Sequence, residues 1–119
     1  MKNKWLLFLF GSLFCLTFTQ CSKTDATGGS IAGYCDGVSS NYTSDVQPLI
    51  TTYCQLGANC HSPGSTNTGG ELTDYSKVFA KRAAIRDAVY SGVMPQSGSL
   101  TTDQKKKIVC WIDNGAPNN

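Results

Sequence analysis

The set of cysteines limits the possible folds of this 119-residue chain more than any other feature. Cys15 falls in the N-terminal leader described below and Cys21 follows that leader directly, so four others remain: Cys35, Cys54, Cys60 and Cys110. A domain of this size buries only about two-thirds of its unfolded surface, so it is marginally stable without cross-links or a cofactor. We therefore expect each of the four thiols to be paired or chemically occupied.

The N-terminus has the layout of an export signal. Lys2 and Lys4 precede a mainly apolar run over residues 5–18, which is too short to span the ~30 Å core of a bilayer comfortably. The run is apolar on every face, which disfavours the alternative of an amphipathic core helix. We predict a signal peptide over residues 1–20 and an exported protein.

Cys21 follows the apolar run and is itself followed by polar residues, a pattern that favours cleavage before Cys21 and its lipidation. Gln20 departs from the small residue usual at that place, so plain secretion is the alternative. A lipid on Cys21 would anchor the protein to a membrane surface without a spanning helix. Residues 21–33 then form a flexible, glycine-bearing tether, and the protein is a lipoprotein of the bacterial periplasm or outer surface.

Removal of the leader leaves eight basic and eight acidic residues, so the net charge is near zero. Nucleic acid is disfavoured as a partner because phosphate binding requires clustered Lys and Arg. The single run of Lys105, Lys106 and Lys107 is predicted to be the solvated face of a helix.

Apolar spacing predicts an all-α domain with long loops over residues 34–119. Residues 44–53 carry one apolar stripe, with Ser44 or Asp45 as a cap and Pro48 tolerable only in or just after the first turn. A second helical region covers about residues 74–91, and its imperfect stripe allows two short helices that meet near Lys81.

The last helix has the clearest signals. Thr101 stands three residues before Gln104, which is a capping-box pattern, and apolar residues follow at helical spacing up to Ile112. Asn114 and Gly115 then predict a left-handed C-terminal cap. No segment shows the period-2 alternation of a convincing strand.

Four residues together have the chemistry that a covalently bound haem needs. Two thiols, Cys54 and Cys60, suit attachment to the vinyl groups, and the imidazole of His61 suits one face of the iron. His61 is the only histidine, and Met94 is the only methionine outside the leader. Within one chain, His/Met ligation is therefore the only six-coordinate arrangement available from the usual ligands.

Several short motifs occur in a familiar order. They are Val-Gln-Pro-Leu-Ile at 46–50, Cys60-His61-Ser62, Tyr-Ser-Gly-Val-Met-Pro at 90–95, Leu100-Thr101, and Trp-Ile-Asp-Asn-Gly-Ala-Pro at 111–117. Over roughly residues 44–117 the chain resembles the short, planctomycete-type cytochrome c-like domains of bacterial lipoproteins. The resemblance implies a helical fold around one covalent haem c, with His61 and Met94 as axial ligands. It implies electron transfer with an unidentified redox partner, and no catalysis.

The spacing between Cys54 and Cys60 departs from that family. The usual attachment motif has two residues between its cysteines, whereas five intervene here, so residues 55–59 would have to bulge outward with Gly57 supplying freedom. Three outcomes are open: both cysteines attached, only Cys60 attached, or no haem and a disulfide between them. The last outcome leads to the alternative function, a haem-free, disulfide-stapled lipoprotein domain with a binding or assembly role. A zinc site at Cys54, Cys60 and His61 would lack a fourth ligand.

Cys35 and Cys110 have no neighbouring histidine and no Cys-x-x-Cys partner. We therefore predict a structural disulfide between them, which joins the segment before the first helix to the last helix. Around the haem ring we expect a shell of apolar side chains that excludes water. The expected members are Leu49, Ile50, Tyr53, Phe79, Ile85, Val89 and Trp111.

Overall fold

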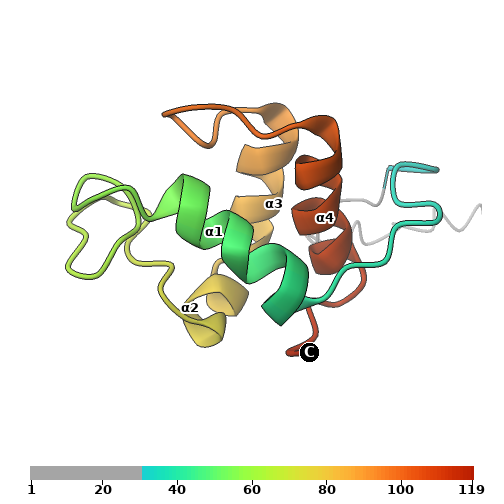
Figure 1. Cartoon of the computed structure of the whole chain (residues 1–119), viewed down its shortest axis with the longest axis horizontal. Coiled ribbons are helices and arrows are strands. Elements are labelled where there is room, and N and C mark those ends of the chain that lie inside the picture. The colour runs from blue at the N-terminus through green and yellow to red at the C-terminus, as the bar shows by residue number, and fades with distance from the viewer. Residues whose placement is uncertain (1–30) are drawn as a thin grey trace, which may run out of the picture.

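A computed structural model describes residues 31–119, and within that range the chain folds as four α-helices and one π-helical turn, with no strand (Figure 1). The prediction of an all-α domain with long loops is confirmed. The predicted signal peptide at 1–20, the predicted lipidation site Cys21 and most of the predicted tether lie outside the described residues. None of the helices in the described range is long and apolar enough to cross a bilayer.

The first helical segment starts earlier than its stripe predicted. A π-helical turn, η1, covers Tyr42–Val46 and runs directly into α1, Gln47–Cys54. Neither Ser44 nor Asp45 is the cap: that position is Asn41, whose N–H donates to the Asp45 carboxylate at 2.9 Å. Pro48 lies at the start of α1, as expected, where its missing N–H costs least.

The second helical region is two helices. α2 covers Tyr75–Ala80, α3 covers Arg82–Ser91, and Lys81 lies between them, as predicted. Asp74 caps α2 by accepting the N–H of Lys77 at 3.0 Å. Hydrogen bonds from Ser76 and from Lys77 hold the pKa of Asp74 well below its ordinary value, so the cap is ionised at neutral pH.

α4 covers Thr102–Asp113 and has the predicted capping box: Gln104 N–H donates to Thr101 Oγ1 at 3.2 Å, and Thr101 N–H donates to Gln104 Oε1 at 2.9 Å. Gly115 has a φ of +94°, which confirms the left-handed turn after the helix. α3 and α4 run side by side, and η1 and α1 cross in front of them in Figure 1.

Trp111 lies at the centre of the core with no exposed surface. Its indole N–H donates to the carbonyl of Pro117 at 2.9 Å, and its ring packs against Tyr42 and Tyr75. The Tyr75 hydroxyl also donates to Ala116 O at 2.9 Å. These bonds fold the C-terminal residues back over the core, so the Trp-to-Pro motif at 111–117 is a structural element.

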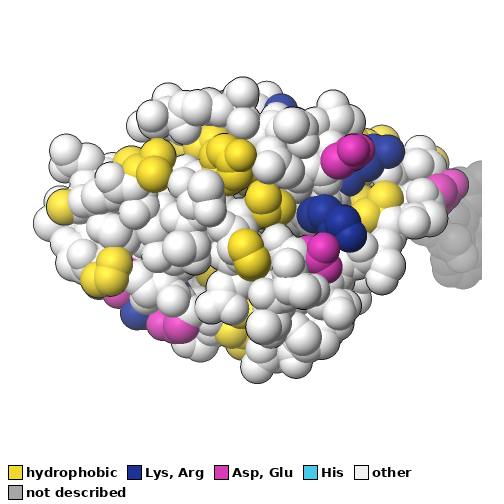
Figure 2. Space-filling view, in the orientation of Figure 1, with side chains coloured by type: hydrophobic (Ala, Val, Ile, Leu, Met, Phe, Trp, Pro, Cys, Tyr) yellow, Lys and Arg dark blue, Asp and Glu magenta, His cyan; other side chains and the backbone are white. Residues whose placement is uncertain are grey.

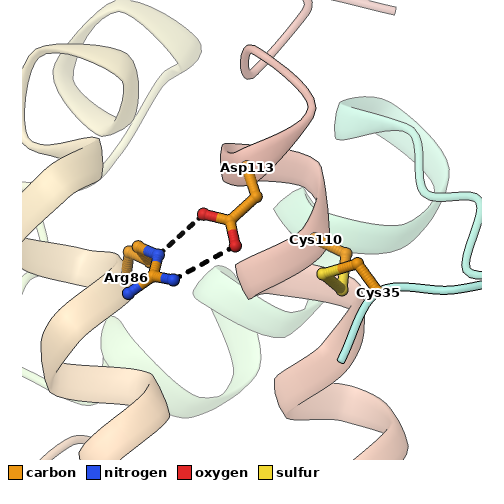
Figure 3. Close-up of a disulfide and its surroundings, with 4 residues drawn as sticks. All are labelled: Cys35, Arg86, Cys110 and Asp113. Atoms are coloured by element: carbon orange, nitrogen blue, oxygen red, sulfur yellow. Dashed lines mark hydrogen bonds and ion pairs between the residues drawn. A yellow bond between two sulfur atoms is a disulfide. The ribbon is translucent and has the colours of Figure 1, made fainter. Parts of the chain in front are cut away.

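The disulfide between Cys35 and Cys110 is present, with a Cα–Cα distance of 5.4 Å (Figure 3). It ties residues before η1 to α4.

The lysines of α4 at positions 105, 106 and 107 do not form a simply solvated face, which corrects the sequence prediction. All three are partly buried, Lys107 forms an ion pair with Asp45 at 3.2 Å, and Lys106 lies 5.5 Å from the centroid of the Tyr34 ring.

A buried ion pair joins α3 to α4 (Figure 3). Arg86 donates through Nε to one Asp113 oxygen at 2.7 Å and through Nη2 to the other at 3.2 Å, and both side chains are almost fully buried. Removal of one partner leaves a buried charge without its counter-ion. We expect Arg86→Met to lower the free energy of unfolding, measured in urea, by about 3 kcal/mol.

The matched control replaces both partners. Arg86→Met with Asp113→Leu exchanges the pair for apolar groups, and such exchanges are often neutral. We expect the double variant to recover most of the lost stability. A double variant as unstable as Arg86→Met alone would show that the loss does not come from the stranded carboxylate.

Candidate functional site

One cavity of about 450 Å³ lies between the C-terminal end of α1, the following loop, one face of α3 and residues 94–97. Cys54, Cys60, His61 and Met94 all line it. These are the four residues that the sequence singled out, although Met94 lies more than thirty positions after His61. The volume lies within the range of small-molecule and cofactor sites.

The wall contributed by α3 is a single helical stripe. Its members recur at i, i+3, i+4, i+7 and i+8, which places them on one face of a helix. They are Lys81, Ala84, Ile85, Ala88 and Val89. The two alanines leave space on this wall, while Ile85 and Val89 make it apolar.

The five-residue spacer forms a compact protruding loop. His61 N–H donates to Cys54 O at 2.9 Å, although the two residues are seven positions apart. In an α-helix the N–H of one residue bonds to the carbonyl four residues earlier. A two-residue spacer would place the histidine four positions after the first cysteine and so allow that helical bond. Here the same pair of backbone groups is joined although the spacer has three additional residues. Gly57 has a φ of +147° and its carbonyl accepts the N–H of Cys60 at 2.9 Å, which confirms its role in the bulge.

Cys54 and Cys60 are free thiols in the structure, and they differ in exposure. Cys54 is buried at the end of α1, and Cys60 is half-buried. Burial, with a smaller contribution from the neighbouring Cys60, raises the pKa of the Cys54 thiol to about 11. Cys54 is therefore protonated at neutral pH.

His61 is held by a backbone carbonyl. Its Nδ1 lies 2.6 Å from Gly70 O. Because a carbonyl oxygen only accepts, this contact assigns the ring proton to Nδ1 and leaves the lone pair of Nε2 free. A fixed Nδ1–H is the usual arrangement of a metal-binding imidazole.

Met94 is positioned by the end of α3. The helix stops at Gly92, whose φ is +80°, and the Met94 N–H then donates to Ala88 O at 3.0 Å. This bond folds the segment back onto the helix that forms the cavity wall. Met94 is half-buried and lines the cavity, whereas the preceding Val93 is 65 % exposed.

The expected apolar shell is only partly correct. Tyr53, Ile85 and Val89 line the cavity. The other four belong to the core or pack against it and do not line the cavity: Leu49, Ile50, Phe79 and Trp111. The sequence stripe identified which side chains turn inward, but it could not distinguish a core-facing from a cavity-facing position.

Two features of the site were missed by sequence reasoning. The first is Lys81, which contributes the only charged group among the cavity-lining residues of the described part of the chain. The second is a pair of loop glycines: Gly69 packs against His61, and Gly70 packs against Lys81. The helical spacing of Lys81 with Ile85 and Ala88 was the signal that could have found it. The zinc alternative finds no support, because no three His, Cys, Asp or Glu side chains within residues 31–119 are grouped to hold a metal ion.

Comparison with family models, with curated proteins and with solved structures finds no match to this chain.

Proposed function

We propose that this protein is an electron carrier that binds one haem c in the cavity. Cys54 and Cys60 would hold it as thioethers, and His61 and Met94 would be the two iron ligands. One observation carries the proposal: both thiols, the only histidine and the only methionine outside the leader line the same cavity.

The residues of the cavity fit such a group. The donor set is an imidazole with a free Nε2 and a thioether, which is the pairing of a c-type cytochrome. Ala84 and Ala88 leave room on the α3 wall, and Leu72 with Ile85 adds apolar surface. Haem iron bound there would accept and release single electrons, and methionine opposite histidine favours the ferrous state.

The spacer supports attachment through both cysteines. The bond from His61 N–H to Cys54 O keeps the two ends of the motif together. The longer spacer at residues 55–59 is accommodated as a loop between these two bonded residues. Leu56 of the spacer is 54 % exposed and borders the cavity. Double attachment is therefore favoured over attachment through Cys60 alone.

Export and anchoring complete the proposal. A lipid on Cys21 would hold the domain at a bacterial membrane surface, in the periplasm or outside the cell, where the disulfide at Cys35 would persist. The redox partner is another protein. The face in Figure 2 carries small groups of both charge signs and no broad basic patch, which suits a protein that does not bind nucleic acid.

Replacement of Met94 tests the assigned iron ligand. In the haem-loaded chain, Met94→Ala is expected to remove the sulfur-ligand signature from the ferric spectrum. We also expect it to lower the reduction potential by more than ~59 mV, a tenfold change for a one-electron couple. Val93→Ala is the matched control, because Val93 is adjacent but largely exposed. An unchanged spectrum and potential in Met94→Ala would refute Met94 as a ligand.

A further inference from the structure

The Gly69 and Gly70 backbone is packed between two side chains of the cavity. A Cβ atom on Gly69 would lie 2.6 Å from His61 Cε1, and one on Gly70 would lie 2.5 Å from Lys81 Nζ. A side chain at residue 69 would collide with the His61 ring, and the φ of +63° at Gly70 favours glycine there, whereas the Lys81 ammonium lies at the end of a flexible chain and can shift. The imidazole of His61 and the ammonium of Lys81 thus contact the same short stretch of chain.

The carbonyls of this stretch divide between the two side chains. Lys81 Nζ donates to Gly69 O and, at 3.3 Å, to Glu71 O. The carbonyl between them, Gly70 O, accepts from His61 Nδ1 at 2.6 Å. Bonds to the carbonyls on either side of Gly70 restrict the backbone torsions around it and so favour the observed direction of the Gly70 carbonyl.

The position of Lys81 in the fold suits this role. It lies at the break between α2 and α3, and its backbone carbonyl accepts the N–H of Ile85 at 3.0 Å. The loop of residues 61–72 has no regular secondary structure of its own. The Lys81 side chain ties the Gly69 to Glu71 stretch of this loop to the helical body.

We infer that Lys81 is a positioning residue that orients the His61 imidazole by holding the Gly69 and Glu71 carbonyls. The significance of this inference rests on the proposed function, in which His61 Nε2 binds iron. Loss of Lys81 would free Gly70 O to turn away, and the imidazole would lose both its fixed orientation and its preference for the Nδ1–H form.

The experiment uses the full chain, because its single histidine gives one set of imidazole signals. Nitrogen-15 correlation spectra of the haem-free chain report which ring nitrogen carries the proton. We expect the Nδ1–H form alone in the wild type and a mixture of both forms in Lys81→Met. Lys105→Met is the matched control, since Lys105 makes no contact with residues 69–71, and it should keep the wild-type spectrum.

Lys81→Gln is the second variant, for use if Lys81→Met does not fold. Its shorter side chain cannot reach both carbonyls, so a mixture of the two imidazole tautomers is expected again. A pure Nδ1–H spectrum in either folded variant would overturn the inference. The tautomer readout does not need haem, so it separates failure of this inference from failure of the proposed function.

Discussion

Replacement of His61 by alanine is expected to prevent the formation of stable haem-loaded protein, with a yield at least ten times lower than that of the wild type. His61 is the only imidazole in the chain, so no other histidine can replace it as the iron ligand. Loading is measured from the haem absorbance per polypeptide after purification from the periplasm of cells that carry haem-attachment machinery.

Thr68→Ala is the control for this result. Thr68 lines the same cavity but is exposed, and its hydroxyl is not a usual iron ligand, so the variant should load as the wild type does. If His61→Ala retained wild-type loading and spectrum, the assignment of His61 as the ligand would be wrong.

Loss of the disulfide is expected to destabilise the domain by about 4 kcal/mol, which is a large part of the stability of a domain this small. The bond closes a loop with a sequence separation of 75 residues, and in the chain-entropy model the gain grows with loop length. Cys35→Ala with Cys110→Ala should therefore unfold at a much lower urea concentration than the wild type.

Reduction of the wild type separates the cross-link from packing. Cys110 is completely buried, so its replacement also removes a packed sulfur. The reduced wild type retains both sulfur atoms, so its loss of unfolding free energy should come from the cross-link alone and be somewhat smaller than that of the double variant. A loss below about 1 kcal/mol on reduction would show that the cross-link contributes little.

The helices and their ends could largely be predicted because their signals are local. The capping box at Thr101 and Gln104, the turn at Gly115 and the break at Lys81 all depend on residues within one or two helical turns. The start of the first helical segment was misplaced. Its cap at Asn41 lies before the apolar stripe begins, and the π-helical turn has no distinct sequence signature.

The scarcity of candidate residues was enough to predict which four side chains meet at the cavity, but not what surrounds them. Whether Ile50 faces the core or the cavity depends on how the helices pack, and the stripe alone carries no such information. The contacts of Lys81 with the Gly69 carbonyl depend on the path of a loop without periodicity. The ion pair of Lys107 with Asp45 depends on how α4 packs against η1, two elements that are remote in the sequence.

The most direct test of the proposed function is the intact mass of the chain after maturation, denaturation and thiol labelling. Matured in the periplasm with haem-attachment machinery, the denatured chain is predicted to retain one haem, and neither Cys54 nor Cys60 should accept label. Label on Cys54 alone would revise the attachment to Cys60 only. A haem-free chain with a disulfide between Cys54 and Cys60, under conditions that mature a control cytochrome, would contradict the electron-carrier proposal and favour the haem-free, disulfide-stapled alternative.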